Sequence, residues 1–312
     1  MNVISPAAHE HGVVLPPPLL AFAERHVGTV LSVTDSSGPR DNSRVWRITA
    51  GHPERSWYLK QHPGAKFHAR EVHAYAHWTP ALEPGGAPEL LAAEVELLAV
   101  ILTALPGVNP RHHDLPPADE REIHRQLGLL LHAFHHSAPR RPAEPDSRLP
   151  DNVQRHLTTA SGHLDPEDVQ LIGRLAARLA TLPPLPRVPT HGDAQISNTI
   201  WNPTTRTLAL IDLERAAYGP AIHDLVRLAY GPWDGRPDLK AAFFTGFGPA
   251  LTPSEADQLR AMAALDALSG IAYGIGTGDG EVVSRGRRTL HRLRRRTGTS
   301  STASEARRPP SA

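Results

Sequence analysis

The stretch VPTHGDAQISNTIWNPTTRTLALIDLERAAYG, residues 188–219, carries the most restrictive pattern in the chain. It predicts a loop, a short strand TIW at 199–201, a turn NPTTR at 202–206 and a second strand TLALID at 207–212, followed by another loop. Asn, Pro and Thr in the turn separate two runs that are rich in β-branched and apolar residues, as expected of a hairpin.

Polar residues stand at the corners of this expected hairpin. His191, Asp193 and Asn198 lie on the first loop, and Asp212 and Glu214 end the second strand. A hairpin can therefore bring Asp193, Asn198 and Asp212 together. Phosphoryl transfer needs such a group, because one carboxylate orients the attacking hydroxyl and other oxygen atoms hold the magnesium that bridges the phosphates.

The sequence before this stretch is rich in strands. VGTVLSVTD at 27–35, VWRITA at 45–50 and SWYLK at 56–60 each favour a strand, with the turn-forming GHPER between the last two. Apolar residues near helical spacing predict a helix over 67–78, and ELLAAEVELLAVILTAL at 89–105 indicates two more strands. An antiparallel sheet followed along the chain by helices is the expected outcome.

The sequence from about residue 108 has helical periodicity. An apolar stripe over 123–134 predicts one helix after an acidic start. Asp165 is expected to cap a second helix, and Thr252 with Glu255 forms the capping box of a third, long helix. The expected buried face of the second helix consists of Val169, Ile172, Leu175 and Leu179.

These patterns predict an α+β fold with an antiparallel-sheet N-lobe and a mainly helical C-lobe. The expected parts are an N-terminal extension with a helix at 1–26, an N-lobe at 27–107, a C-lobe at 108–283 and a basic, disordered tail at 284–312. The tail holds nine arginines and one glutamate among Ser, Thr, Gly and Pro, a composition that buries little apolar surface.

HGDAQISN matches the H-G-D-x-x-x-x-N loop of the aminoglycoside phosphotransferase and choline kinase superfamily, and LIDLE matches its I-D-x-E segment. The chain therefore resembles this superfamily, whose members share the two-lobed protein-kinase-like fold. The resemblance implies that Asp193 is the catalytic base, that His191 braces the loop, and that Asn198 and Asp212 hold Mg²⁺. Glu214 is then expected to support Asp212.

The N-lobe resembles the same superfamily in its nucleotide-binding parts. Lys60 in YLK resembles the lysine that contacts the nucleotide phosphates, and Glu71 resembles its glutamate partner. The chain uses lysine only at positions 60, 66 and 240, so a lysine at 60 is notable where a compact charge is needed. LTALPG, with Thr103 and Leu105, resembles the hinge that faces adenine, and Ser43 is a candidate for phosphate contact in a loop without G-x-G-x-x-G.

The resemblance implies ATP or GTP with Mg²⁺ as the phosphoryl donor and a small hydroxylated molecule, such as an aminoglycoside-like antibiotic, as the acceptor. Seven acidic against three basic residues at 234–281 would suit a polycation. Two alternatives stay open. A protein kinase is disfavoured because D-F-G and A-P-E are lacking, and a catalytically silent kinase-like binding protein is disfavoured because every expected chemical group is present.

Other features have structural interpretations. His132, His135 and His136 are expected at a core edge or surface rather than on a metal, and Asp224 is expected to cap a helix or bond the catalytic loop. There is no cysteine, which excludes disulfides and thiolate metal sites. No run approaches a membrane span, and the basic tail is interpreted as solvated rather than nucleic-acid-binding. A cytoplasmic monomer without nucleic-acid or membrane partners is expected.

Overall fold

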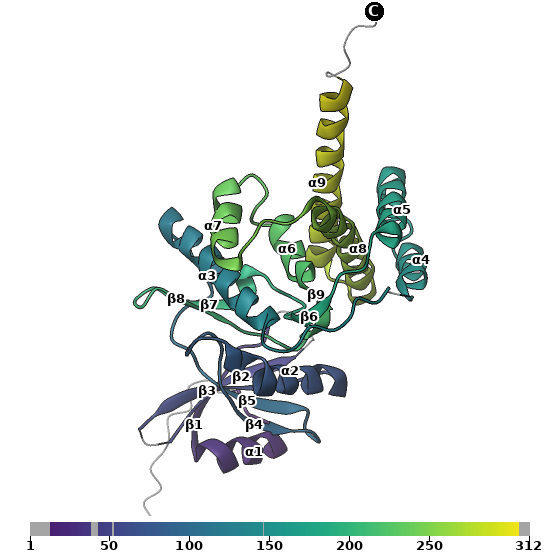
Figure 1. The fold of residues 1–312 in the computed structure, drawn as a ribbon. Coiled ribbons are helices and arrows are strands. Elements are labelled where there is room, and N and C mark those ends of the chain that lie inside the picture. The colour runs from purple at the N-terminus through teal and green to yellow at the C-terminus, as the bar shows by residue number, and fades with distance from the viewer. Residues whose placement is uncertain (1–12, 39–42, 52, 146, 306–312) are drawn as a thin grey trace, which may run out of the picture. The chain divides into compact units, whose positions relative to one another are not determined.

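The computed structural model describes residues 13–38, 43–51, 53–145 and 147–305 (Figure 1). The chain divides into two compact units. The first unit comprises residues 1–116 and 196–217, and the second comprises residues 117–195 and 218–312. The first unit is built mainly on a sheet and the second mainly on helices, which confirms the predicted α+β fold class.

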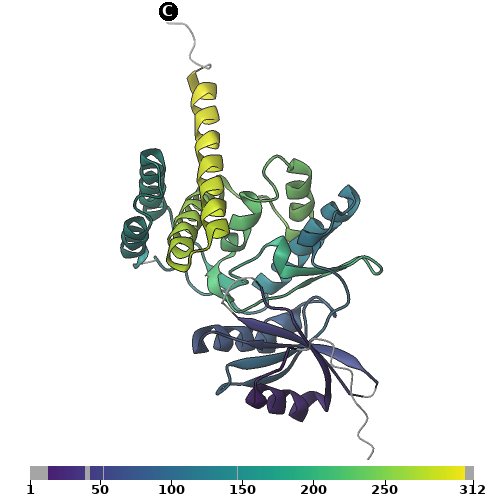
Figure 2. The same ribbon diagram turned by 180° about the vertical axis from the view of Figure 1, so that it is seen from behind.

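The first unit contains a five-stranded antiparallel sheet in the order β1-β2-β3-β5-β4. Each of these strands was predicted. Figures 1 and 2 show the two long helices of this unit on opposite sides of the sheet. The elements are β1 (Val30–Asp35), β2 (Arg44–Ala50), β3 (Arg55–Gln61), β4 (Leu90–Glu94) and β5 (Ala99–Thr103), with α1 (Pro17–Val27) and α2 (Ala65–His77).

Helix α1 closes the core on one side of this sheet. Leu19, Phe22 and Ala23 of the helix pack against Trp46 and Ile48 of β2, and all five side chains are buried. Burial of such side chains contributes about 1.5–3 kcal/mol each for the large ones. The helix expected within residues 1–26 is therefore present as an integral layer of the sheet.

The predicted hairpin at 199–212 also forms and belongs to the first unit. β7 (Thr199–Asn202) pairs antiparallel with β8 (Thr207–Leu210). Val108 bonds Trp201 in both directions, N to O, at 2.9 and 2.8 Å. This bridge attaches the hairpin to the segment that follows β5. Short 3-10 turns complete the unit: η1 (Thr79–Ala81), η2 (Pro110–His112) and η3 (Ile196–Asn198).

The second unit is mainly helical. Helices α3 and α7 approach closely at two glycines. A Cβ on Gly128 would lie only 2.2 Å from the Phe243 carbonyl oxygen. A Cβ on Gly246 would lie only 2.0 Å from the Arg125 carbonyl oxygen, so neither position has room for a side chain. Its elements are α3 (Pro117–His135), α4 (Leu149–Thr159), α5 (Pro166–Thr181), β6 (Arg187–Thr190), β9 (Ala217–Pro220), η4 (Ala221–Leu225), α6 (Val226–Ala229), α7 (Pro237–Phe247), α8 (Pro253–Thr277) and α9 (Gly280–Glu305).

Two local expectations in this unit differ from the structure. The tail expected to be disordered from residue 284 is helical as α9 up to Glu305, because Leu290 and Leu293 are fully buried and the helix packs along α8. Val169 is 42% exposed, and Leu171 takes the buried position beside Ile172. The predicted capping box of Thr252 and Glu255 is confirmed.

Among the described residues, none of the helices combines the length and apolar character that crossing a membrane requires.

Candidate active site

Lys60 lies at the centre of a charged cluster in the first unit. Strand β3 presents it, and its Nζ lies 2.9 Å from Glu71, 2.6 Å from Asp212 and 3.0 Å from Glu214. The three carboxylates come from helix α2 and from the middle and the last residue of the LIDLE segment. One ammonium thus faces three carboxylates, so the cluster carries an excess of negative charge.

Burial makes the charge states of this cluster interdependent. Burial alone would lower the pKa of Lys60, but Asp212, Glu71 and Glu214 outweigh it and hold that pKa well above its ordinary value. Burial alone would raise the pKa of Glu71, whereas Lys60 and His62 bring it below the ordinary value. Both groups are therefore charged at neutral pH.

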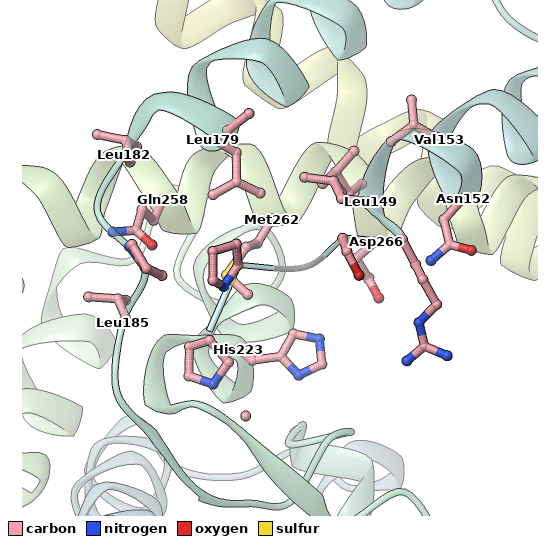
Figure 3. A pocket seen from close by; sticks show the side chains of 18 of the residues that line it. Leu149, Asn152, Val153, Leu179, Leu182, Leu185, His223, Gln258, Met262 and Asp266 are labelled. Atoms are coloured by element: carbon pink, nitrogen blue, oxygen red, sulfur yellow. The ribbon is translucent and has the colours of Figure 1, made fainter. Parts of the chain in front are cut away.

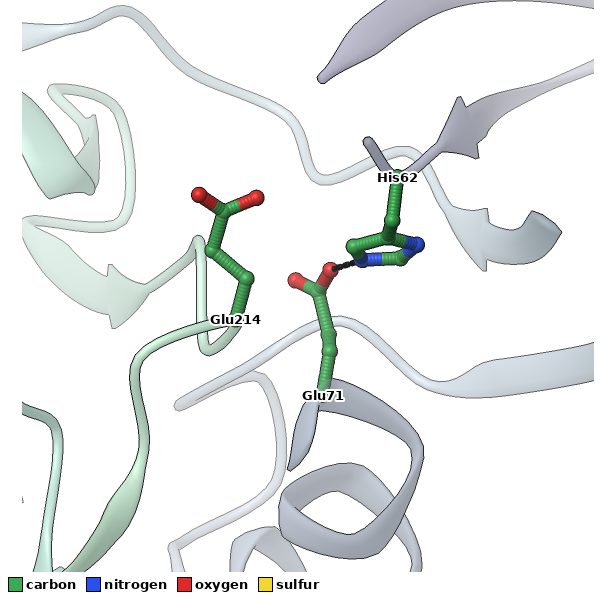
Figure 4. A group of neighbouring side chains, drawn as sticks. All are labelled: His62, Glu71 and Glu214. Carbon is green, nitrogen blue, oxygen red and sulfur yellow. Dashed lines mark hydrogen bonds and ion pairs between the residues drawn. The ribbon is translucent and has the colours of Figure 1, made fainter. Parts of the chain in front are cut away.

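His62 fixes Glu71 from the side opposite to the LIDLE segment. Its Nδ1 lies 3.0 Å from the Leu98 carbonyl oxygen and its Nε2 bonds Glu71 Oε2 (Figure 4). The other oxygen of Glu71 accepts a hydrogen bond of 3.1 Å from the Leu213 backbone N–H. His62 therefore links the Glu71 carboxylate to the backbone at Leu98.

Asp212 differs from its neighbours in exposure and backbone conformation. Its side chain is 38% exposed, whereas those of Lys60 and Glu71 are buried. Its φ is 65°, in the left-handed region that non-glycine residues seldom adopt. Strain of this kind persists where the surrounding contacts enforce it and is concentrated at functional sites. The backbone of Asp212 is thus held in a strained conformation, while its carboxylate remains accessible to solvent.

The oxygen atoms of Asn198 and Asp212 fit the magnesium ligation expected of them. The Ile211 N–H donates to the backbone carbonyl oxygen of Asn198 at 3.1 Å, so the hairpin places residue 198 beside the residue that precedes Asp212. Carboxylate and amide oxygens are the donors that Mg²⁺ prefers. The coordinating atoms of His62, Glu71 and Glu214 also lie within 4.8 Å of one another. The Lys60 ammonium already contacts both of those glutamates, so it takes the place of a cation there.

The loop with His191 and Asp193 belongs to the second unit and follows β6. Asp224 holds it, because its two carboxylate oxygens accept from the backbone N–H groups of His191 at 2.9 Å and Gly192 at 2.8 Å. His135 donates to the same carboxylate at 2.8 Å. Burial alone would raise the pKa of Asp224, but His135 and the nearby imidazoles hold it below its ordinary value. Asp224 therefore bonds the loop, as the sequence predicted.

Asp193 itself forms an ion pair with Arg227 of α6. The Gln195 side-chain amide donates to the same carboxylate oxygen at 3.0 Å. Arg227 also lies 3.7 Å from Asp266 of α8. Burial would lower the pKa of Arg227, but Asp193 and Asp266 raise it, so the guanidinium stays charged. A partly buried cation thus lies between the two carboxylates.

The structure brings together Lys60, Glu71 and Asp212, of which the pairing of Lys60 with Glu71 was expected from the resemblance. Ser43 joins them indirectly, because its Oγ donates to Glu214 at 2.6 Å. Asn198 and Asp212 belong to the first unit and Asp193 to the second, so their convergence stays a prediction.

The expected hinge residues lie at and after the end of β5. The Thr103 hydroxyl accepts from the Glu89 N–H at 2.9 Å, and Leu105 is partly buried in the segment that follows.

Sequence reasoning missed His62 and Arg227. The only signals were indirect. His62 lies two residues after the lysine, with its ring on the same side of the strand, and Arg227 lies three residues after Asp224. Neither spacing alone distinguishes a site residue from an ordinary polar position.

A family model and several solved structures resemble this chain. The model described as the phosphotransferase enzyme family matches residues 33–266, which is more than half of the chain. The chain belongs to the phosphotransferase enzyme family. No curated protein sequence matches it.

Among solved structures, the GDP complex of aminoglycoside 2'-phosphotransferase-IIIa has a TM-score of 0.65 at 15% identity, covering 86% of this chain and 94% of that one. A thermostable mutant of aminoglycoside phosphotransferase APH(4)-Ia has 0.64 at 16%, covering 89% and 98%. Macrolide 2'-phosphotransferase MphH from Brachybacterium faecium has 0.61 at 19%, covering 88% and 97%. At such identities the likeness shows the fold, and it confirms the expected two-lobed, kinase-like architecture of this phosphotransferase.

Proposed function

We propose that this member of the phosphotransferase family transfers the γ-phosphoryl group of ATP or GTP to a hydroxyl group of a small polar molecule. The observation that carries the proposal is the Lys60 cluster, where one ammonium faces three carboxylates and Asp212 stays accessible. An accessible carboxylate in a site with excess negative charge is suited to a divalent cation, and an adjacent ammonium is suited to phosphates.

In this proposal each residue of the first unit has a defined part. Lys60 contacts the nucleotide phosphates, with Glu71 holding its ammonium in position. The backbone at Thr103 and Leu105 faces the base. Asn198 and Asp212 hold Mg²⁺, which when bound neutralises charge that develops on the phosphate oxygens. Solved structures of similar fold are described as complexes with GDP, ADP or AMP-PNP, which supports nucleotide binding here.

The second unit supplies the group that acts on the acceptor. Asp193 orients the hydroxyl and accepts its proton as the oxygen attacks the γ-phosphorus. The bond from that phosphorus to the β,γ-bridging oxygen breaks, and the nucleoside diphosphate leaves with both electrons. His191 acts through the backbone, since its N–H and that of Gly192 bond Asp224 and fix the loop. Arg227 must release Asp193 or share it with the hydroxyl.

The first acceptors to examine are aminoglycosides, because related structures are described with hygromycin B, gentamicin and spectinomycin. The proposal also includes a monomeric enzyme in the cytoplasm, where nucleoside triphosphates are available. The competing candidate is a kinase-like protein that binds nucleotide without turnover. Nucleotide-induced thermal stabilisation without turnover on any acceptor of a broad panel would favour it.

Asp193→Asn tests the proposed reaction. Because the amide cannot accept the hydroxyl proton, turnover should fall by about 10² to 10⁴ with nucleotide affinity nearly unchanged. The measurement is Mg²⁺-dependent ATP consumption across a panel of hydroxylated compounds, with AMP-PNP binding followed by calorimetry. Asp238→Asn is the matched control, since that carboxylate pairs with Arg236 on the surface of α7. Normal turnover by Asp193→Asn would contradict the assignment.

A further inference from the structure

The second unit contains a cavity of about 850 Å³ whose lining comes from α4, α5, α8, η4 and the segment after α5. Pockets for small molecules span about 300 to 1,000 Å³, so this one has room for a large organic ligand. Figure 3 shows apolar side chains from three helices converging with Asp266 and His223. The apolar part of the wall includes Leu149, Val153, Leu179, Leu182, Leu185 and Met262.

The charged side chains of the cavity balance one another. Glu144 and Asp266 are acidic, and Arg148 and Arg187 are basic. Glu144 is already engaged in an ion pair with Arg187. Asp266 is 35% exposed, and its contact with Arg227 is 3.7 Å, which is long for an ion pair. A ligand therefore meets the Asp266 carboxylate on a wall that is mainly apolar and also carries Arg148 and several uncharged polar side chains.

The cavity adjoins the loop that carries the proposed catalytic carboxylate. Arg227 contacts both Asp193 and Asp266, so a group bound at Asp266 lies next to the cation that holds Asp193. His223 lines the cavity and immediately precedes Asp224, which fixes the backbone of the same loop. A molecule in the cavity therefore lies close to the residues that hold the Asp193 loop, and a cationic group at Asp266 competes with Arg227 for that carboxylate.

We infer that this cavity binds the phosphoryl acceptor, and that the acceptor is an amphiphilic hydroxylated molecule with a bulky apolar body and a single cationic group at Asp266. The inference rests on the proposed function and narrows its acceptor class. A polycation is disfavoured, because the two arginines offset the two acidic groups and the leucine and methionine walls cannot solvate further ammonium groups. The acidic excess counted over 234–281 in the sequence is not repeated in the lining of this cavity.

Four hydroxylated probes test separately the need for an apolar body, for a single cationic group and for several cationic groups. N-octyl-D-glucamine carries hydroxyls, one amine and an apolar chain, and N-methyl-D-glucamine lacks the chain. Octyl β-D-glucoside keeps the chain without the amine, and kanamycin is a polycationic aminoglycoside. Binding to the full chain is measured by calorimetry below the micellar concentration. N-octyl-D-glucamine should bind on the order of 10²-fold more tightly than N-methyl-D-glucamine, because the chain is buried, and more tightly than kanamycin.

Variants locate the binding to the cavity. Met262→Gln keeps the length of the side chain and should weaken both octyl probes by about 10-fold, because a polar group enters the apolar wall. Asp266→Asn should weaken N-octyl-D-glucamine about 5-fold and leave the glucoside unchanged. The matched control is Leu129→Gln on α3, since Leu129 is 45% exposed and lies outside the cavity lining, so all affinities should stay at wild-type values.

Three results would overturn the inference: tighter binding of kanamycin than of N-octyl-D-glucamine, unchanged octyl affinities in Met262→Gln, or equal loss of both octyl probes in Asp266→Asn. These measurements require no phosphoryl transfer. Selective binding without turnover of any hydroxylated ligand therefore refutes the proposed function and leaves the binding assignment intact. If wild type and the cavity variants turn over their acceptors equally well, only the binding assignment is refuted.

Discussion

Buried charge is stabilised differently in the Lys60 cluster of the first unit and around Asp224 in the second unit. Asp224 is completely buried, and backbone N–H groups and His135 satisfy its two oxygens. At Lys60 the acidic groups outnumber the ammonium, and one of them, Asp212, stays accessible. Protein donors occupy both carboxylate oxygens of Asp224, whereas the Lys60 cluster can accept a further cation.

This difference separates a structural carboxylate from a functional one. A carboxylate whose lone pairs all meet protein donors stabilises a loop, and its removal costs stability. A carboxylate in a site with surplus negative charge is costly unless a ligand supplies positive charge. Mutations should therefore affect stability at Asp224 and ligand binding at Asp212.

Asp224→Ala should have the largest effect on stability. It leaves two backbone N–H groups and the His135 donor without their acceptor in a buried place, which costs about 3 to 5 kcal/mol of unfolding free energy. Urea denaturation measures the loss, and Asp224→Asn should fall between the variant and wild type. Asp257→Ala, which breaks a pair with Arg178 that is about half exposed, should stay near wild type. Equal midpoints for Asp224→Ala and Asp257→Ala would remove the distinction between the clusters.

Lys60→Met should invert the acid response of stability. In wild type the pKa of Glu71 is lowered, so its contribution to stability is present above about pH 4.5 and is lost as pH falls through the folded value. Without the ammonium, mutual repulsion and burial raise the carboxylate pKa values above those of the unfolded chain. The variant should then gain stability as pH falls from 7 to about 5.

Thermal unfolding across this pH range measures the change. Lys66→Met on α2 is the control, because Lys66 takes part in none of the ion pairs found among the described residues and should leave the wild-type response intact. A falling stability of Lys60→Met over the same range would show that the carboxylates do not depend on Lys60.

His62→Phe should have a smaller effect that is specific to nucleotide use. Loss of the bond to Glu71 frees that side chain to move away from Lys60, and groups that orient a site residue typically contribute about 10- to 100-fold. We expect a loss of this size in kcat/KM for ATP, with KM for the acceptor unchanged. His77→Phe serves as the control, since His77 is exposed at the end of α2 and its ring lies against that of His73. An equal rise in both KM values would indicate general disruption.

The sequence predicted much of the fold and the centre of the site. Strands β1 to β5, the hairpin of β7 and β8, and the pairing of Lys60 with Glu71 follow from local patterns and from motif resemblance. The bond from Asp224 to the loop was also anticipated. These features depend on residues that are close in sequence or on a motif whose geometry is shared within the family.

The remaining contacts depend on residues far apart in the chain. Ser43 meets Glu214 across 171 positions, and no local pattern encodes that bond. In the sequence, Arg227 and His62 do not differ from ordinary polar positions, because their carboxylate partners come close to them only in the folded structure. The many arginines of α9 led to the wrong prediction of a disordered tail. Its two buried leucines stabilise the helix through packing along α8, which the local sequence does not indicate.

The most direct test of a cation site at Asp212 is calorimetric titration of AMP-PNP into wild type and Asp212→Asn, with and without Mg²⁺. Wild type should bind AMP-PNP in a Mg²⁺-dependent manner, and Asp212→Asn should lose about 10²-fold in affinity together with the Mg²⁺ dependence. The Asp238→Asn control should bind as wild type does. Undiminished Mg²⁺-dependent binding by Asp212→Asn would show that Asp212 does not hold the cation.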